Sequence, residues 1–155
     1  MKERFMQEAI LLSRKMMHEN KSGPFGAIIV KDNNIVGKGY NQVTSHNDPT
    51  AHAEIQAIRN ACQQLNTFDL TGTEIYTSCE PCPMCLSAIW WAKIEKIIYA
   101  ANREDASNAG FRDNDFYQEL NKNKEARTVT MEEILREEAL LTFDEWLKKT
   151  DKIPY

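Results

Sequence analysis

The chain has 155 residues, a formal net charge of -4 and 27% charged residues, and this length fits one folded domain. The mixture of apolar and charged residues excludes a disordered chain, and no apolar run approaches the roughly 20 residues that span a membrane. The acidic balance argues against a general nucleic-acid binder, because such proteins gain affinity from Lys and Arg that neutralise phosphates.

The N-terminal segment predicts an amphipathic helix over residues 3–20. Apolar side chains recur there at helical spacing, and Ser22-Gly23-Pro24 ends the pattern. No apolar signal-peptide core follows Met1. We therefore expect one cytoplasmic domain over residues 1–155, with its cysteines reduced.

The middle of the chain alternates strands and helices. A hairpin is predicted from 27–31 and 35–41, with the three residues Asp32-Asn33-Asn34 as its connection. A helix over 51–64, a strand over 73–78, a helix over 83–91 and a strand over 96–101 follow. Such alternation predicts an α/β fold with helices on both faces of the sheet and parallel strands later in the chain.

The last third of the chain is less regular. Residues 102–124 show no clear pattern, and 128–131 predict a fifth strand. Leu140, Phe143 and Leu147 are among the apolar residues that predict a last amphipathic helix over 136–149. Residues 151–155 are expected to form a short tail.

Three groups of residues carry the candidate chemistry: Asn41 at a strand end, His52-Ala53-Glu54, and Cys82-Pro83-Met84-Cys85. Two cysteines separated by two residues, together with a histidine, are typical zinc ligands, since zinc prefers thiolate and imidazole. The histidine and the cysteines are placed where helices are expected to begin, and the positive end of a helix dipole favours thiolate. We predict one zinc ion per chain, held by His52, Cys82 and Cys85.

The number of ligands predicts the kind of zinc site. Three protein ligands leave a fourth position for water, which is the catalytic rather than the structural arrangement. Zinc lowers the pKa of water to about 7, and a carboxylate must then accept and return protons, so Glu54 is the candidate. Residues two apart do not share a helix face. His52 must therefore lie in the irregular first turn if both side chains are to reach the metal.

Other interpretations of the cysteines stay open. Cys79 could complete a closed four-ligand site, which would be structural and would make the chain a zinc-stabilised binding module. A redox C-x-x-C is a further alternative, but Pro83, Met84 and the nearby H-x-E disfavour it. Cys79 ends an apolar strand and Cys62 lies on an apolar helix face, so both are also expected as packed core thiols.

The combination of H-x-E with P-C-x-x-C is typical of zinc nucleobase deaminases. The chain resembles the cytidine deaminase superfamily over most of its length, in Asn41 and the segments 24–27, 47–54 and 77–85. Ala109-Gly110-Phe111, Asp113 and Tyr155 resemble most the bacterial guanine deaminases of that superfamily. The resemblance implies a three-layer α/β/α sandwich around a five-stranded mixed sheet. It also implies a homodimer whose C-terminal helix and tail, residues 136–155, can cross to the partner subunit.

The resemblance further implies hydrolytic deamination of guanine to xanthine and ammonia, with Glu54 as the proton shuttle. The implied substrate-binding groups are Asn41, the backbone N–H of Ala53, the pocket walls Phe25 and Trp91, and Asp113 and Tyr155 near the departing amine. A carboxylate at Asp113 suits guanine, because it can accept from the amine and from a ring N–H, whereas adenine has an acceptor nitrogen there. Within Arg112-Asp113-Asn114-Asp115, Asp113 could also be a turn residue.

A tRNA adenosine deaminase and a guanosine or cytosine deaminase are the enzymatic alternatives with the same core. An enzyme that binds an RNA loop needs a basic surface, but residues 126–155 hold five Lys or Arg against seven Asp or Glu. We therefore expect a small-molecule purine substrate, with neither a membrane nor a nucleic acid as partner.

Overall fold

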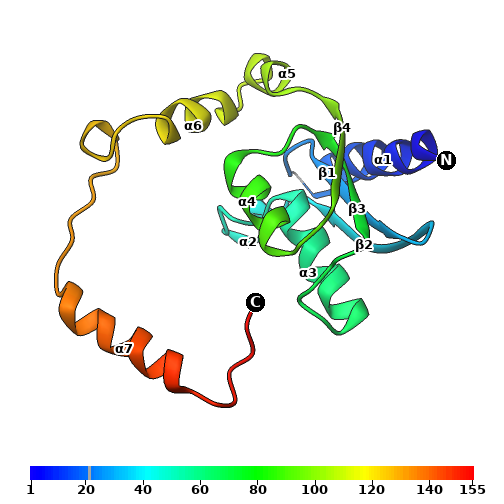
Figure 1. Ribbon diagram of the computed structural model, residues 1–155. Coiled ribbons are helices and arrows are strands. Elements are labelled where there is room, and N and C mark those ends of the chain that lie inside the picture. The colour runs from blue at the N-terminus through cyan, green and yellow to red at the C-terminus, as the bar shows by residue number, and fades with distance from the viewer. Residues whose placement is uncertain (21) are drawn as a thin grey trace. The chain divides into compact units, whose positions relative to one another are not determined.

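The computed structural model describes residues 1–20 and 22–155 (Figure 1). The chain forms two compact units, residues 1–117 and 118–155, and each is described by itself. The elements are α1 (Lys2–Asn20), β1 (Gly26–Lys31), β2 (Asn34–Tyr40), α2 (Val43–His46), α3 (Ala53–Leu65), β3 (Thr73–Cys79), α4 (Pro83–Trp91), β4 (Lys96–Ala101), α5 (Arg103–Asn108), α6 (Asp113–Leu120), the 3-10 helix η1 (Lys124–Ala126) and α7 (Arg136–Lys148).

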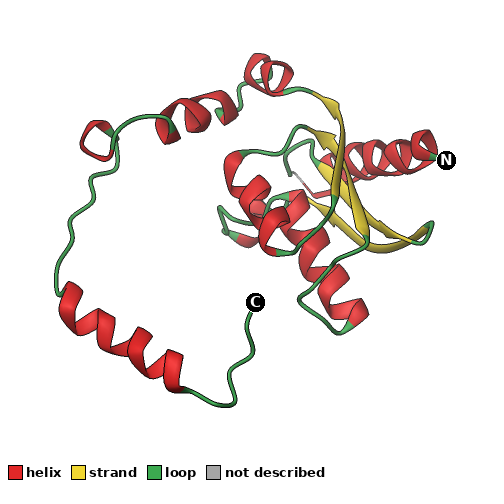
Figure 2. Cartoon of the chain, in the orientation of Figure 1, coloured by secondary structure: helices red, strands yellow, loops and turns green. Residues whose placement is uncertain are grey.

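The central sheet has four strands in the order β2-β1-β3-β4 (Figure 2). β1 is antiparallel to β2 and β3, whereas β3 and β4 are parallel and are joined through α4. The predicted mixed sheet with parallel strands later in the chain is therefore confirmed. The predicted fifth strand is wrong, because residues 128–131 are exposed and form no strand in the described chain. A short strand without a neighbour leaves its backbone groups outside any ladder.

Helices cover both faces of the sheet, as the three-layer prediction requires. β1 alternates its side chains between the two faces, as a strand must. Ile28 and Val30 meet Phe5 and Ala9 of α1 in one apolar cluster. On the opposite face, a second cluster joins the sheet to α3 and α4 through Ala27, Ile29, Ile75, Ala53, Ala57, Ala61 and Ile89.

The hairpin connection is one residue shorter than predicted. Only Asp32 and Asn33 separate β1 from β2, and both have positive φ values, 49° and 62°. Two successive left-handed residues are typical of a type I′ turn, whose twist matches that of the flanking strands. Asn34 therefore starts β2 and pairs with Lys31.

α3 packs closely on β2 at two glycines of that strand. A Cβ atom at Gly39 would lie 2.1 Å from the carbonyl oxygen of Ala53 and 2.3 Å from the backbone nitrogen of Ala57. A Cβ atom at Gly37 would meet the same helix, 2.5 Å from the Ala57 carbonyl oxygen. The absence of side chains at these positions therefore sets the distance between β2 and the segment of α3 from Ala53 to Ala61.

The second unit contains α7, which the sequence predicts over 136–149. In the described chain α7 buries none of its residues, and Leu141, Phe143 and Leu147 are exposed. No helix among the described residues has both the length and the apolar composition needed to cross a membrane.

A carboxylate organises the turn that leads into β3. Asp69 Oδ1 accepts from the backbone nitrogen of Thr71 at 2.9 Å and from its hydroxyl at 2.5 Å. Asp69 Oδ2 lies 2.9 Å from Nζ of Lys93, in the loop after α4. The hydrogen bonds from Thr71, followed by that from Lys93, hold the pKa of the Asp69 carboxyl well below its usual range.

We expect Asp69→Asn to lower the midpoint of thermal unfolding at pH 7, with a smaller loss at pH 3. A depressed native pKa stabilises the fold above the unfolded pKa of about 3.9, and this contribution is lost as the pH falls through the native value. Thermal melts at pH 7, 5 and 3 would measure the difference, with the exposed Asp144→Asn as control. An equal loss at pH 7 and pH 3 would contradict the role of the charge.

Candidate active site

Two helix N-termini bring the predicted metal ligands together. His52 is the N-cap of α3 and Cys82 is the N-cap of α4, and both have extended backbone conformations. Pro83 occupies the first turn of α4, where its missing N–H costs no helical hydrogen bond. Cys85 follows in the same turn, so both thiols and the imidazole lie at the positive ends of helix dipoles.

The distances between the three side chains fit a zinc ion. His52 Nδ1 lies 3.6 Å from Cys82 Sγ and 3.5 Å from Cys85 Sγ. Zinc–nitrogen bonds of about 2.0 Å and zinc–sulfur bonds of about 2.3 Å at a tetrahedral angle place nitrogen and sulfur about 3.5 Å apart. All three ligand atoms lie within 4.8 Å of one another. The donor set of one imidazole and two thiols is one that zinc prefers.

Cys79 does not join this group in the described chain. The cluster that could hold a metal ion consists of His52, Cys82 and Cys85, and the Cys79 thiol instead faces the carbonyl oxygen of Asn102 at 3.7 Å. Burial is the main cause that raises the pKa of the Cys79 thiol to about 11, which keeps it protonated. This arrangement favours three protein ligands over the closed four-ligand alternative.

The two cysteine ligands share one hydrogen-bonding system. Hydrogen bonding from Cys85, supported by His52, lowers the pKa of Cys82 to about 4, although burial opposes the shift. The same contact raises the pKa of Cys85. The lowered pKa favours the thiolate form of Cys82, and a thiolate is the form in which cysteine binds metals.

Glu54 lies against the ligands, in the first turn of α3. Its side chain is only 5% exposed, and its Oε2 atom accepts from the Cys85 thiol at 3.4 Å. Because His52 caps the helix in an extended conformation, both side chains reach the same site, as the spacing argument required. Burial raises the pKa of the Glu54 carboxyl. A carboxyl group with a raised pKa is suited to carrying protons near neutral pH.

Thr77 is a site residue without a predicted role, although it lies in the segment 77–85 that resembles the family. It lies on the central strand β3, is buried, and places its hydroxyl oxygen 3.0 Å from Glu54 Oε1. The same hydroxyl oxygen lies 2.9 Å from the carbonyl oxygen of Cys79. The hydroxyl thus anchors the carboxylate to the sheet.

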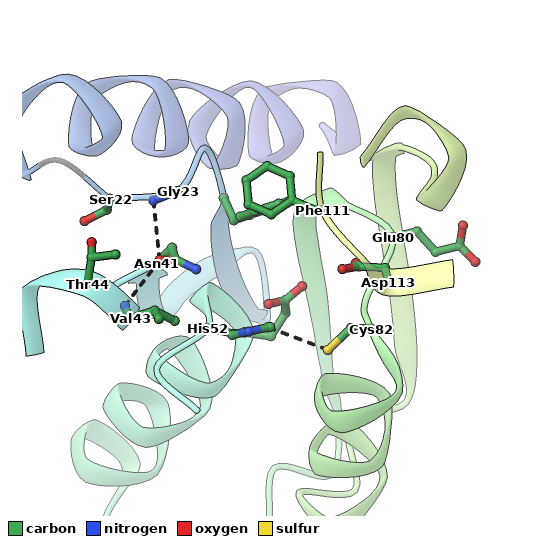
Figure 3. Close-up of a pocket in the computed structure, with 12 residues that line it drawn as sticks. Ser22, Gly23, Asn41, Val43, Thr44, His52, Glu80, Cys82, Phe111 and Asp113 are labelled. Atoms are coloured by element: carbon green, nitrogen blue, oxygen red, sulfur yellow. Dashed lines mark hydrogen bonds between the residues drawn. The ribbon is translucent and has the colours of Figure 1, made fainter. Parts of the chain in front are cut away.

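A cavity of about 390 Å³ opens above these residues. Figure 3 shows Ser22, Asn41 and Thr44 on one side of the His52–Cys82 pair and Asp113 on the other. The cavity is lined by Ser22, Gly23, Phe25, Asn41, Val43, Thr44, His52, Glu54, Glu80, Cys82, Phe111 and Asp113. The structure therefore places polar groups on both sides of the metal ligands.

Asn41 is buried directly after β2 and is held by two backbone donors. Its Oδ1 atom accepts from the backbone nitrogen of Gly23 at 3.4 Å and from that of Val43 at 3.2 Å. These bonds fix the orientation of the amide, so its NH2 group is turned toward the middle of the cavity (Figure 3). Asn41 can therefore donate a hydrogen bond to an acceptor on a bound ligand.

The aromatic walls of the cavity differ from the predicted pair. Phe25 lines the cavity, but its partner is Phe111, at 4.7 Å between ring centroids in an edge-to-face arrangement. Trp91 is not among the described lining residues, and its side chain is 67% exposed. Trp91 ends α4, whose first turn carries the ligands, and eight residue steps along a helix amount to about 12 Å.

The remaining predicted residues lie as follows. Asp113 is the first residue of α6 and lines the cavity, and burial is the main cause that raises the pKa of its carboxyl. Ala53 is buried in the first turn of α3, where backbone N–H groups have no carbonyl partner within the helix. Tyr155 belongs to the second unit, so its place in a site stays a prediction.

Comparisons with known proteins agree with this geometry. Residues 1–101 match the cytidine and deoxycytidylate deaminase zinc-binding region. The chain is 45% identical to a guanine deaminase of Bacillus subtilis, over 99% of this chain and 98% of that protein. The X-ray structure of guanine deaminase from Bacillus subtilis has a TM-score of 0.95 at the same identity and coverage. A tRNA-specific adenosine deaminase of Aquifex aeolicus is 47% identical, over 64% of this chain and 66% of that protein.

Proposed function

Because the chain belongs to the family of the cytidine and deoxycytidylate deaminase zinc-binding region, we propose that it hydrolyses guanine to xanthine and ammonia. The observation that carries the proposal is the His52, Cys82 and Cys85 cluster with Glu54 against it, at the base of a cavity that Asp113 also lines. The match to a guanine deaminase over nearly the whole chain supports the choice of substrate.

The mechanism assigns the proton transfers to Glu54. Zinc, when bound by these three ligands, supplies the Lewis acidity that makes water a nucleophile at neutral pH. Glu54 accepts the proton of that water and delivers it to a ring nitrogen of guanine. As that proton moves, the water oxygen would bond to C2 of guanine. Glu54 would then take the remaining proton from the new C2 hydroxyl and pass it to the C2 amine, which leaves as ammonia when the C2–N bond breaks and C2 becomes a carbonyl. Proton transfer by a placed carboxylate contributes about 10²–10⁴-fold to such a rate.

The two sides of the cavity would recognise opposite edges of the purine. Asn41 donates its amide N–H to an acceptor of the ring, and the backbone N–H of Ala53 acts in the same way. Asp113 accepts from the exocyclic amine and from the adjacent ring N–H. Phe25 and Phe111 contribute apolar contact with the base. Adenine would fit this arrangement less well, since its ring nitrogen beside the amine is an acceptor and would face the Asp113 carboxylate.

A tRNA adenosine deaminase is the second candidate, because relatives with that name share the zinc-binding core. Two observations favour guanine. The Aquifex relative matches about two thirds of this chain, whereas the guanine deaminase matches 99% of it. The C-terminal residues 126–155 carry more acidic than basic side chains, which disfavours contact with RNA phosphates.

The proposal is tested by measuring the release of ammonia from guanine, guanosine, adenine, cytosine and a tRNA anticodon stem. We expect kcat/KM for guanine to exceed that for adenine, cytosine and the anticodon stem by about 10²–10⁴-fold, since a site that hydrogen-bonds one pattern rejects another. The rate on guanosine, which carries the same hydrogen-bonding edge as guanine, shows whether the site accepts a ribose. Highest turnover on the anticodon stem would replace the proposal by the tRNA enzyme. Zinc-loaded protein that releases no ammonia from any of them would favour the binding module.

We also propose that the chain forms a homodimer in which residues 136–155 of one subunit reach the other. Leu141, Phe143 and Leu147 of α7 are exposed, and Trp90 on α4 is 76% exposed. Apolar side chains of this size are normally buried in an interface or a core. Tyr155 would then contribute to the partner's site. The cytoplasmic location expected from the sequence stays a prediction.

Mixing two inactive variants tests the crossing tail. If Tyr155 serves the partner's site, a mixed dimer of Glu54→Gln and Tyr155→Ala chains contains one site with both native residues. Random mixing should therefore restore about a quarter of the wild-type activity, because half of the dimers are mixed and each has one intact site. Refolding each variant alone is the control. No recovery in a mixture shown to contain mixed dimers would contradict the crossing.

A further inference from the structure

A hydrogen bond ties α6 to the loop that carries a metal ligand. The hydroxyl of Tyr117 donates to the carbonyl oxygen of Pro81 at 2.8 Å. Pro81 is buried and directly precedes Cys82. Asp113 and Tyr117 are four residues apart on α6, so they lie on the same face of that helix, one turn from each other. The bond at Tyr117 therefore holds the face that presents Asp113 to the cavity.

Arg103 adds a second connection to the same loop. Its guanidinium carbon lies 4.7 Å from the centroid of the Tyr117 ring, within the range of a cation–π contact. The backbone nitrogen of Arg103 donates to Glu80 Oε2 at 3.1 Å, and Glu80 precedes Pro81. These contacts form a closed network: Tyr117 contacts Pro81 and Arg103, Arg103 contacts Glu80, and Glu80 directly precedes Pro81.

The segment that carries Arg103 is itself fixed to the sheet. The backbone nitrogen of Glu80 donates to the carbonyl oxygen of Ala101 at the end of β4, at 2.8 Å. Asn102 caps α5 in a capping box with Asp105, which sets the start of the helix. Arg103 therefore approaches Tyr117 from a constrained position.

α6 is preceded by an apolar contact, in which Phe111, two residues before Asp113, packs on Phe25 outside the metal-ligand loop. The helix itself is eight residues long and, in the described chain, buries none of its residues. Helices of this length are marginal in water without tertiary contacts. The ion pair between Arg112 and Asp115 is exposed and lies within the helix region, so it does not attach α6 to the metal-ligand loop.

We propose that Tyr117 is a positioning residue that sets the place of Asp113 for recognition of the substrate, with Arg103 and Glu80 as its supports. This inference rests on the proposed function, in which Asp113 accepts hydrogen bonds from guanine. A displacement of about 1 Å in such a group can cost about 10²-fold in rate. These contacts place Asp113 relative to the loop that carries Cys82, and with it relative to the metal ligands.

Tyr117→Phe tests the proposal, because it removes the hydroxyl and keeps the ring beneath Arg103. We expect kcat/KM for guanine to fall about 10-fold, with zinc content unchanged, since only the anchor of α6 is lost. Tyr99→Phe, which removes the hydroxyl of an exposed tyrosine on β4, is the matched control and should keep the wild-type rate. Arg103→Gln should lower kcat/KM in the same direction, because it weakens the contact with the Tyr117 ring.

A double-mutant cycle shows whether Tyr117 acts through Asp113. In an Asp113→Ala background, Tyr117→Phe should cause no further fall in kcat/KM, because effects of residues that act as a unit do not add. A repeat of the full fall in that background would overturn the proposal.

Amide hydrogen exchange of residues 113–120 tests the anchor without any reaction. Tyr117→Phe should speed exchange in this segment, and Tyr99→Phe should leave it unchanged. Unchanged exchange in Tyr117→Phe would overturn the anchoring role. If the unmodified protein does not act on guanine, the proposed function fails, while the exchange result still decides whether Tyr117 holds α6.

Discussion

Glu54→Gln is expected to lower guanine turnover by about 10²–10⁴-fold while the chain still binds one zinc ion. The amide keeps the shape of the carboxylate and can still accept from the Thr77 hydroxyl, which lies 3.0 Å from Oε1 in the native chain. It cannot take a proton from water or return one to the departing amine. Measurement of kcat together with zinc content by atomic emission would separate the two roles.

A carboxylate away from the cavity provides the control for this substitution. Glu8 on α1 has a partly exposed side chain that faces Lys38, so Glu8→Gln should leave turnover unchanged. Full activity in Glu54→Gln would exclude Glu54 as the proton carrier. Loss of zinc along with activity would instead indicate that the carboxylate supports the ligands, for example through its 3.4 Å contact with Cys85.

Gly39→Ala is expected to lower the free energy of unfolding by about 1–3 kcal/mol or more, because it overpacks a tight backbone contact. The new Cβ would lie 2.1 Å from the carbonyl oxygen of Ala53 and 2.3 Å from the nitrogen of Ala57. Backbone atoms of α3 can give way only if the helix moves. Because His52 caps that helix, zinc affinity should fall with stability.

Urea unfolding and zinc titration would measure both effects of Gly39→Ala. Lys38→Ala, at the exposed neighbouring position on β2, is the matched control and should change stability by less than about 0.5 kcal/mol. Wild-type stability in Gly39→Ala would show that β2 and α3 can separate at little cost. Lowered stability with unchanged zinc affinity would show that the position of His52 does not depend on this contact.

Elements with a strong apolar pattern were predictable from the sequence. The helix over 83–91 and the strand over 96–101 have the predicted bounds in the structure. Each buries apolar side chains or pairs with a neighbouring strand, and such contacts leave a regular pattern in the sequence. The hairpin was also predictable, but its turn length was not, because the left-handed conformation of Asp32 and Asn33 decided it.

The secondary structure of residues 102–124 could not be predicted, because this region buries few apolar side chains. It forms α5 and α6, of which α5 buries Ala106 and α6 buries no residue in the described chain. A helix that buries almost nothing needs no apolar stripe, so periodicity carries no signal there. The place of α6 depends instead on the bond from Tyr117 to Pro81, which joins residues 36 positions apart.

The candidate metal chemistry could be predicted from the amino-acid sequence, because ligand types and their spacing are local properties. Cys82 and Cys85 lie in one helical turn, and His52 and Glu54 in another, so short motifs contain all four. The side chains that surround them could not be predicted in this way, because they meet through contacts between distant elements. Thr77, Phe111 and the contacts of Tyr117 come from separate elements, and Trp91 lies at the C-terminal end of α4, away from the turn that carries the cysteines. Packing across the sheet sets these neighbours, and no short stretch of sequence encodes it.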